Sequence, residues 1–298
     1  ATGGGANSSE PPGAAAIGGP TPGTVEGLDD VTWFTPAAID ATEDLPAGYA
    51  EKCATTVANS DVRRCDFGDP NADTVLALVG DSKIMQWESA IRQVADDNGW
   101  RVVTFYKSAC AFQGAMVVAD GAPYTACAEW NERALADVLD LKPDLVLTSH
   151  VKNTALADPD NVRSAKRQVL VDALVERWQE LEDAGIPVAV ILDNPNPQSS
   201  IYECVAENPD DLAACTFDRK KGLAYSGAPA LAAAAAEMDD VPVIDLNAWI
   251  CPEEQCVPVI GNVLIYRQTS HLTDTYVRSL APRLAGQLVP IVEETGRD

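Results

Sequence analysis

Ser82 is the residue whose surroundings in the sequence best suit a nucleophile. It follows Gly80 and Asp81 at the end of the apolar run 74–79, and apolar residues recur behind it at spacings of three and four. This pattern places Ser82 on the turn from a buried strand into a helix. There its hydroxyl is exposed, and its N–H lies at a helix N-terminus, which favours negative charge. The same tripeptide is also ordinary turn and N-cap chemistry, so the local pattern leaves both roles open.

His271 is the candidate base for this serine. The sequence has two histidines, and His271 lies in the segment 266–273, just before the last helical pattern of the chain. A serine activated by a histidine can attack an acyl carbon and form a covalent acyl-enzyme. The alternative role for His271 is a loop histidine that caps the final helix or packs beneath it.

The elements that must position these residues are predicted from short apolar runs that alternate with amphipathic segments. We expect strands at 74–79, 101–105, 144–148, 187–192 and 241–245, and helices at about 84–98, 128–141, 161–183, 222–237 and 273–289. Such alternation favours a three-layer α/β fold, with a five-stranded parallel sheet covered by helices on both faces. Ligands bind at the C-terminal ends of the strands in such sheets, which is where Ser82 falls.

The chain divides into three parts by composition. Residues 1–26 are rich in Gly, Ala, Pro, Ser and Thr, which predicts a disordered linker. Residues 27–72 hold Trp33, Phe34 and the first two cysteines, and we expect this extension to wrap the core. Residues 73–298 form the predicted α/β domain.

The composition excludes several classes of protein. With 46% hydrophobic and 22% charged residues, the 298-residue chain can bury one substantial core. The formal net charge of −24 disfavours nucleic acid and anionic lipid as partners, and its simplest role is solubility. The apolar runs are shorter than the roughly 18–20 residues of a membrane span. The sequence also shows no signal peptide.

The eight cysteines indicate an oxidising compartment. They occur as four pairs of near neighbours: Cys53 and Cys65, Cys110 and Cys127, Cys204 and Cys215, Cys251 and Cys256. Eight cysteines allow 105 connectivities, and pairing of neighbours would close four short loops. Zinc is the rival explanation, but CxxC spacing is absent and histidines are few. We therefore predict neighbouring disulfides in an extracytoplasmic protein.

Several separated motifs together resemble one subgroup of the SGNH/GDSL hydrolase superfamily. The subgroup is the extracytoplasmic SGNH domain fused behind acyltransferase family 3 membrane proteins, which O-acylate cell-surface glycans. The resemblance covers about residues 50–290 and implies the flavodoxin-like SGNH fold, with Ser82 as nucleophile and His271 as base. The motifs that carry it are Cys65-Asp66-Phe67-Gly68-Asp69, Gly80-Asp81-Ser82 with Trp87, Lys107-Ser108-Ala109-Cys110, Cys127-Ala128-Glu129-Trp130-Asn131, and Tyr266-Arg267 through His271-Leu272-Thr273.

Two residues depart from the pattern of this subgroup. Lys83 stands where a histidine usually follows the serine, and Gln268 stands where an aspartate usually precedes the histidine by three. An amide can accept the Nδ1–H of the imidazole but brings no charge, and replacing a triad aspartate by an amide can cost about 10⁴ in turnover. The site is then a Ser–His dyad oriented by an amide, a weak enzyme, or one whose carboxylate comes from elsewhere.

The remaining site residues follow from position and from the resemblance. In SGNH enzymes the oxyanion is held by the serine N–H, a backbone N–H and an Asn side chain, which here implies Ser82, Ala109 and Asn153. Asn153 can equally be a loop or cap residue. We assign substrate binding to residues beside these motifs, although His150 can also be a structural histidine: Asp81, Lys83, Trp87 and His150.

The resemblance implies transfer of a short acyl group to or from glycan hydroxyls, without a cofactor. The partners are then an acyl donor, a glycan acceptor and an N-terminal membrane acyltransferase domain that tethers this domain to the cell surface. The fragment itself is expected to be monomeric. Two other functions stay open: a secreted carbohydrate esterase with water as acceptor, and a non-catalytic glycan-binding domain, which Gln268 keeps in consideration.

Overall fold

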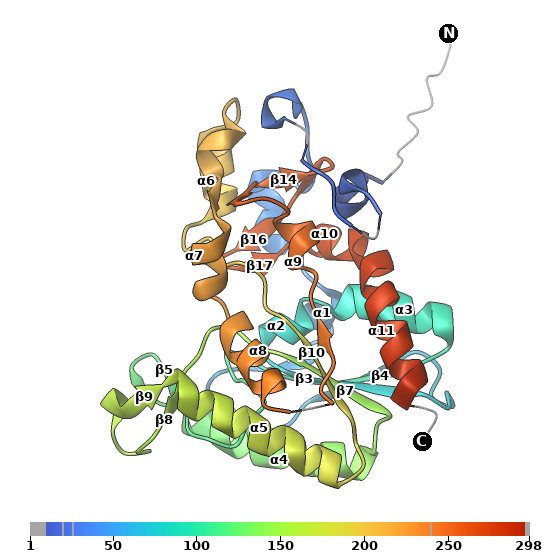
Figure 1. Cartoon of the computed structure of the whole chain (residues 1–298), viewed down its shortest axis with the longest axis vertical. Helices are drawn as coiled ribbons and strands as arrows, with labels where there is room; N and C mark the ends of the chain where they lie inside the picture. Colours follow the sequence, from blue (N-terminus) through green and yellow to red (C-terminus); the bar gives the residue numbers. More distant parts are fainter. Residues whose placement is uncertain (1–9, 20, 26, 239, 296–298) are drawn as a thin grey trace.

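A parallel sheet runs through the centre of the molecule in the computed structural model, which describes residues 10–19, 21–25, 27–238 and 240–295 (Figure 1). Its five main strands lie in the order β4-β3-β7-β10-β12. This is the flavodoxin-like order, in which the chain reverses direction across the sheet beside the first strand. All five fall where the sequence predicts strands: β3 (Val75–Gly80), β4 (Arg101–Lys107), β7 (Leu145–Ser149), β10 (Val188–Ile191) and β12 (Val243–Ile244).

The N-terminal extension adds two strands that the sequence did not predict. β1 (Ala54–Thr55) pairs in parallel with the end of β4, and β2 (Arg64–Phe67) pairs antiparallel with the start of the same strand. The sheet of the described residues therefore has seven strands instead of five. The extension completes the sheet edge as well as covering the core.

Helices cover both faces of the sheet, as predicted. Leu76 and Leu78 of β3 face one apolar cluster, and Ala77 and Val79 face the other, because side chains alternate along a strand. α3 (Glu88–Asn98), α10 (Asp274–Ser279) and α11 (Ala281–Thr295) pack on the first face. α4 (Thr125–Leu141), α5 (Arg167–Asp183) and α8 (Ala228–Ala236) pack on the second. Figure 1 shows the sheet between these two layers.

Four of the predicted helices are divided in the structure. Residues 84–98 become α2 (Ser82–Met85) and α3, and residues 273–289 become α10 and α11. Residues 222–237 become α7 (Arg219–Ala224) and α8, which restarts after Gly227 with Pro229 in its first turn, a position that suits proline. Residues 161–183 begin with a short 3-10 turn, η4 (Val162–Ser164), and a two-residue strand before α5.

Short elements make up the rest of the described chain. The helical ones are η2 (Leu28–Asp30), η3 (Ala38–Glu43), α1 (Ala47–Ala50), α6 (Ile201–Glu207), η5 (Leu212–Cys215) and α9 (Asn247–Ile250). The two-stranded ribbons are β5 (Val118–Ala119) with β6 (Ala122–Pro123), β8 (Ala155–Leu156) with β9 (Ala165–Lys166), β11 (Phe217–Asp218) with β13 (Gln255–Cys256), β14 (Val259–Ile260) with β15 (Val263–Leu264), and β16 (Tyr266–Gln268) with β17 (His271–Leu272). None of the described helices is long and apolar enough to cross a membrane.

The predicted linker over residues 1–26 is wrong for part of its length. Residues 13–17 form the 3-10 helix η1 (Gly13–Ile17), in which Ala14 and Ile17 are buried in the core. The Ala14 N–H donates to Ser279 Oγ of α10 over 2.9 Å. Residues 1–9, 20 and 26 lie outside the described residues, so the prediction stands untested there.

Candidate active site

Ser82 and His271 meet at the C-terminal edge of the sheet. Ser82 is the first residue of α2, directly after β3, and the Asp81 carboxylate caps this helix by accepting the Lys83 N–H over 2.8 Å. His271 opens β17, and the two-residue turn before it joins β17 to β16. The Ser82 Oγ lies 2.7 Å from His271 Nε2. This is the contact that a serine nucleophile needs with its base.

Gly80 allows β3 to reach this position. Its φ is +144°, and a Cβ atom there would come within 2.8 Å of the Ser149 carbonyl oxygen at the end of β7. β3 and β7 are the neighbours at which the strand order reverses, so a side chain at residue 80 would push apart the edge that carries Ser82.

The imidazole of His271 is oriented by its own hairpin. When Nε2 accepts the Ser82 proton, Nδ1 carries the ring proton. Nδ1 lies 3.3 Å from Thr269 Oγ1, and the backbone carbonyl of Gln268 also hydrogen-bonds the ring. This corrects the prediction for Gln268, whose side chain is exposed in the wall of a pocket. The tight turn brings the Gln268 main chain, not its amide group, to the ring.

The surroundings of His271 favour the neutral imidazole. Burial lowers its pKa well below the ordinary 6.5, and the positive charges of Lys83 and Arg267 lower it further. The hydrogen bond to the Gln268 carbonyl raises the pKa of His271, but by less than burial and the two positive charges lower it. The base is therefore free to accept a proton at neutral pH, and the imidazolium that forms is poorly stabilised.

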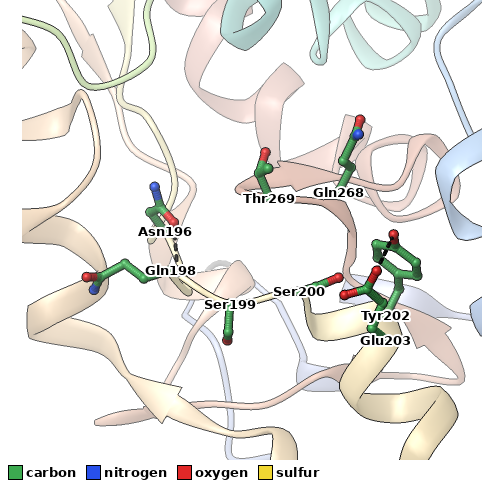
Figure 2. A pocket seen from close by; sticks show the side chains of 8 residues that line it. All are labelled: Asn196, Gln198, Ser199, Ser200, Tyr202, Glu203, Gln268 and Thr269. Carbon is green, nitrogen blue, oxygen red and sulfur yellow. Dashed lines mark hydrogen bonds between the residues drawn. The ribbon is translucent and has the colours of Figure 1, made fainter. Parts of the chain in front are cut away.

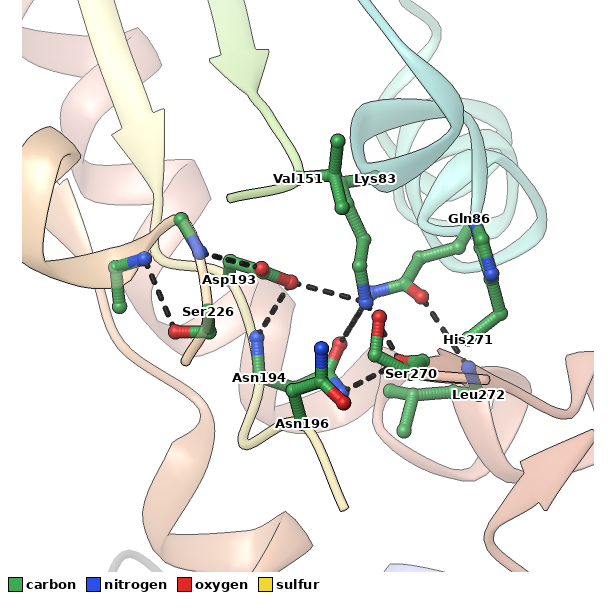
Figure 3. A network of polar contacts seen from close by, with 12 residues as sticks. Lys83, Gln86, Val151, Asp193, Asn194, Asn196, Ser226, Ser270, His271 and Leu272 are labelled. Carbon is green, nitrogen blue, oxygen red and sulfur yellow. Dashed lines mark hydrogen bonds and ion pairs between the residues drawn. The ribbon is translucent and has the colours of Figure 1, made fainter. Parts of the chain in front are cut away.

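Lys83 belongs to a buried polar network that contacts the hairpin of His271 (Figure 3). Its ammonium group is 3.0 Å from the Asp193 carboxylate, and it donates to Asn194 Oδ1 over 3.0 Å and to the Ser270 carbonyl over 2.6 Å. Burial lowers the Lys83 pKa, and the Asp193 carboxylate opposes this as the main favourable charge. The second Asp193 oxygen accepts the Gly227 N–H over 2.7 Å.

The same network holds both neighbours of His271 in the chain. Asn194 donates to the Ser270 carbonyl over 2.8 Å, and Gln86 accepts the Leu272 N–H over 3.2 Å. Gln86 also donates to Asn194 Oδ1 over 2.9 Å. The hairpin that carries the histidine is thus fixed from α2 and from the end of β10. The sequence analysis did not identify these three residues: Gln86, Asp193 and Asn194.

One signal could have found two of them. Asp193 and Asn194 directly follow the predicted strand 187–192, and Asp81 and Ser82 follow the strand 74–79 after Gly80. The C-terminal ends of parallel strands lie on one edge of a sheet. This rule would have placed Asp193 and Asn194 near Ser82, although the sequence analysis above did not apply it to them.

Asp81 fastens the two strands on either side of the topological switch. Besides capping α2, its second oxygen accepts the Val151 N–H in the loop after β7, over 2.9 Å. Burial raises the pKa of Asp81 to about 7, and the nearby Asp193 charge adds to this. The two backbone donors and Lys83 favour the ionised form and limit the rise.

Four residues predicted to bind substrate are buried instead, which corrects that prediction. Their side chains fill the interior behind Ser82, so none of them is positioned to contact a ligand: Asp81, Lys83, Trp87 and His150. The Nδ1 atom of His150 lies 2.7 Å from the Val151 carbonyl oxygen, and burial lowers its pKa. The alternative that His150 is structural fits this position.

The oxyanion candidates lie on the two loops that flank Ser82. Ala109 follows β4 and has a φ of +52°, and Asn153 follows β7. Both strands are neighbours of β3, so both loops leave the sheet at the edge of Ser82. Asn153 Oδ1 accepts the Thr154 N–H over 2.8 Å, which is a local turn contact. The oxyanion roles of Ser82, Ala109 and Asn153 stay predictions.

The four disulfides join neighbouring cysteines, and this prediction is confirmed. The pairs are Cys53–Cys65, Cys110–Cys127, Cys204–Cys215 and Cys251–Cys256. Cys110 directly follows Ala109, so its bond to α4 pins the loop of that oxyanion candidate. The Cys53–Cys65 bond joins the two edge strands of the extension.

The chain matches a known protein family, and its fold is similar to that of a solved structure. The family described as SGNH domain (fused to AT3 domains) matches residues 52–286. The periplasmic domain of a lipopolysaccharide acetyltransferase from Salmonella ser. Paratyphi A aligns with a TM-score of 0.58 and 12% identity, over 85% of this chain and 100% of that one. No curated protein matches the sequence significantly.

Two further solved structures are more distant. A GDSL-like lipase from Bacteroides thetaiotaomicron aligns with a TM-score of 0.41 and 12% identity, over 74% of this chain and 88% of that one. An acetyl xylan esterase aligns with a TM-score of 0.43 and 12% identity, over 72% of this chain and 99% of that one.

Proposed function

Because the chain belongs to the family of SGNH domains fused to AT3 domains, we propose that it is an extracytoplasmic acyl-transfer domain. It would move a short acyl group, such as acetyl, to or from a glycan hydroxyl through an acyl-enzyme on Ser82. The observation that carries the proposal is the 2.7 Å contact between Ser82 Oγ and His271 Nε2. The four disulfides support an oxidising compartment.

The chemical steps follow from the positions of these atoms. Ser82 Oγ attacks the acyl carbon while its proton passes to His271 Nε2, and the donor oxygen leaves with that proton. The tetrahedral oxyanion would be held by the N–H groups of Ser82 and Ala109 and by the Asn153 amide. In the second half, His271 removes a proton from the acceptor hydroxyl, whose oxygen attacks the acyl carbon. The bond from that carbon to Ser82 Oγ breaks, and His271 returns the proton to Ser82.

Among the described residues, no carboxylate bonds to the imidazole ring, whose side-chain partners are Thr269 and Ser82. Asp193 of the buried network is paired with Lys83. The Gln268 carbonyl fixes the tautomer of His271, but Lys83 and Arg267 disfavour the imidazolium. We therefore propose a working but slow enzyme. The alternative of a non-catalytic glycan-binding domain has only the exchange of aspartate for Gln268 in its favour.

Hydrolysis of p-nitrophenyl acetate tests the proposal. We expect the intact chain to release p-nitrophenol, and the Ser82→Ala variant to fall to the uncatalysed background. Ser164→Ala is the matched control, because the Ser164 hydroxyl bonds to main-chain groups around the η4 turn: it donates to the carbonyls of Asp158 and Asn161 and accepts the Asp158 N–H. Equal activity of Ser82→Ala and the intact chain would overturn the proposal.

The acceptor needs a separate measurement. If a glycan hydroxyl is the acceptor, adding an unacetylated oligosaccharide should yield an acetylated product and speed release of p-nitrophenol beyond the rate in water. If water is the acceptor, only acetate forms, and the domain is an esterase. The membrane tether and the N-terminal acyltransferase domain belong to the proposal as implied by the family.

A further inference from the structure

A pocket of about 500 Å³ lies beside the hairpin that carries His271 (Figure 2). One wall is the hairpin turn, with Gln268 and Thr269, and the other is the segment from residue 196 to residue 203, which includes the start of α6. Thr269 lines the pocket and also contacts the proposed base, because its Oγ1 is 3.3 Å from His271 Nδ1. The pocket therefore lies on the Nδ1 side of His271, next to the proposed catalytic pair.

The side chains of this pocket suit a polyhydroxylated ligand. All eight lining residues are polar, and they present amides, hydroxyls and one tyrosine ring: Asn196, Gln198, Ser199, Ser200, Tyr202, Glu203, Gln268 and Thr269. Amides and hydroxyls can both donate and accept, as sugar hydroxyl groups require. The Tyr202 ring offers an apolar surface with a polar tip, which matches the C–H face of a pyranose.

The pocket is formed in advance of any ligand. Tyr266 on the hairpin donates to the Pro195 carbonyl over 2.9 Å, and Asn194 donates to the Ser270 carbonyl, so the two walls are joined at their base. Asn196 Oδ1 accepts the Gln198 N–H over 2.8 Å. Gln198 and Thr269 have φ values of +60° and +46°, which non-glycine residues adopt only when surrounding contacts hold them there.

The charge of the pocket disfavours anionic sugars. Glu203 is the one charged lining residue, and the whole chain carries a net charge of −24. A uronic acid or a phosphorylated sugar would lose its hydration and meet a carboxylate of the same sign. A neutral sugar has no such cost.

We propose that this pocket binds a neutral sugar ring of the glycan that gives or receives the acyl group. This inference rests on the proposed acyl-transfer function, and it adds the place and the charge class of the glycan. Tyr202 provides the platform for the ring, and Glu203 excludes anionic glycans. Tyr202 is thus a positioning residue and Glu203 a specificity residue. The making and breaking of bonds is carried out by Ser82 and His271.

The experiment compares three acetyl esters: p-nitrophenyl acetate, acetylated cello-oligosaccharides and acetylated oligogalacturonides. Tyr202→Ala should lower kcat/KM for the cello-oligosaccharide by roughly tenfold more than for p-nitrophenyl acetate, mainly through KM, as loss of an aromatic anchor does. Tyr202→Phe keeps the ring and should stay within about threefold of the intact chain. Trp33→Ala, an exposed aromatic residue outside the pocket, is the matched control.

Glu203→Gln tests the charge. It should raise kcat/KM for the oligogalacturonide relative to the cello-oligosaccharide by roughly three- to tenfold, the size of one unfavourable charge contact near a surface. An unchanged ratio would overturn the assignment of Glu203. Circular dichroism and thermal unfolding of every variant would show whether any loss comes from unfolding.

Calorimetric titration separates failure of the pocket from failure of the proposed function. Ser82→Ala protein should bind unacetylated cello-oligosaccharide, and adding Tyr202→Ala should abolish that binding. If binding is lost with Tyr202 while Ser82→Ala retains esterase activity, the pocket stands and the acyl-enzyme proposal fails. If Ser82 is essential but Tyr202→Ala affects the sugar ester and p-nitrophenyl acetate equally, the pocket proposal is overturned.

Discussion

Lys83 shows how one residue can support the candidate active site while its side chain is buried away from any ligand. Its side chain is fully buried, and its contacts run to Asp193, Asn194 and the carbonyl next to the histidine. Burying an ion pair costs desolvation energy, which is recovered only while both partners are present. The role of the residue after the serine is therefore to hold the histidine hairpin at a fixed distance from Ser82.

We expect replacement of Lys83 alone to destabilise the fold much more than replacement of both Lys83 and Asp193. We expect Lys83→Met to lower the free energy of unfolding by about 3–5 kcal/mol, because it leaves the Asp193 charge buried and unpaired. Lys83→Met with Asp193→Asn should recover most of that loss, since the amide oxygen can still accept the Gly227 N–H. Urea unfolding of the two variants and of Asp193→Asn checks this, and additive losses would contradict it.

We expect the esterase activity to persist at mildly acidic pH. Because burial, Lys83 and Arg267 hold the pKa of His271 well below 6.5, the imidazole stays neutral as the pH falls through that value. We expect kcat/KM for p-nitrophenyl acetate to be level from pH 8 to about 6.5 and to fall only at lower pH. A profile that already falls by half at pH 6.5 or above would show that the imidazolium is stabilised after all.

The stability of the fold should depend on His271 in the same direction. A lowered pKa in the folded state means that the unfolded chain takes up this proton first as the pH falls below 6.5. The contribution of His271 to stability is therefore present above 6.5 and lost below it. Asp81, with its pKa raised to about 7, acts oppositely, since its contribution is lost as the pH rises towards 7.

Gln268→Asp tests what orients the histidine. Were the Gln268 amide a stand-in for a triad carboxylate, this change would raise turnover by as much as ~10³–10⁴. The structure leads us to expect a change of less than roughly tenfold, because the main-chain carbonyl already serves the ring and the side chain is exposed. Turnover of p-nitrophenyl acetate would be measured beside Gln268→Asn. A rise approaching the upper figure would mean that an aspartate side chain reaches Nδ1.

At the scale of elements, the predicted strands and helices account for the five main strands of the sheet and the helices that cover them. The clearest signals are apolar runs buried on both faces, as in Leu76 to Val79 of β3. β1 and β2 escaped prediction because they are short and partly charged, with Arg64 and Asp66 exposed on β2. Their pairing is decided by the free edge of β4, which a local pattern does not contain.

The candidate site likewise contains residues that the sequence could predict and residues that it could not. Ser82 and His271 carry local signals, namely a strand end, a helix start and a loop before the last helix. The network beneath them joins Lys83 to Asn194 across 111 residues, and it depends on which strand ends meet in space. Burial of Trp87, His150 and Lys83 likewise follows from the packing of the helices over the sheet.

We expect loss of the Cys204–Cys215 disulfide to weaken binding of the sugar more than it slows cleavage of the ester bond. It ties α6, which carries Tyr202 and Glu203, to the η5 turn. Replacing both cysteines by serine should cost roughly 2–4 kcal/mol of stability. It should also raise KM for the acetylated oligosaccharide. The double serine variant at Cys53 and Cys65, on the sheet edge, is the comparison. An equal rise of KM in both variants would contradict a local effect.

At the scale of the whole molecule, the segment that contains η1 packs with the last two helices, α10 and α11. Ala14 bonds to Ser279, 265 residues away, and Ile17 is 3% exposed in the same cluster as the core of α11. A disordered tether would contribute nothing to the core. Composition alone did not reveal this, because one isoleucine among small residues gives no periodic signal.

Ile17→Ala distinguishes a packed segment from a tether. We expect it to lower the free energy of unfolding by roughly 2–5 kcal/mol, since it leaves a cavity in a filled interior. Thr21→Ala, at an exposed position in the same segment, should change it by less than about 0.5 kcal/mol. Thermal or urea unfolding of the two variants measures the difference. A neutral Ile17→Ala would restore the interpretation of this segment as a linker.

The hydrogen bonds on either side of His271 have a consequence for motion. Ser270 and Leu272 are both held by buried side chains, so the turn can lift from Ser82 only by breaking the bonds that Lys83, Asn194 and Gln86 make to it. The Leu272 amide can then exchange its hydrogen with solvent only in states that also open this buried network. Although Gln268 and Thr269 of the same hairpin are exposed, we therefore expect the Leu272 amide to exchange with the slow openings of the molecule.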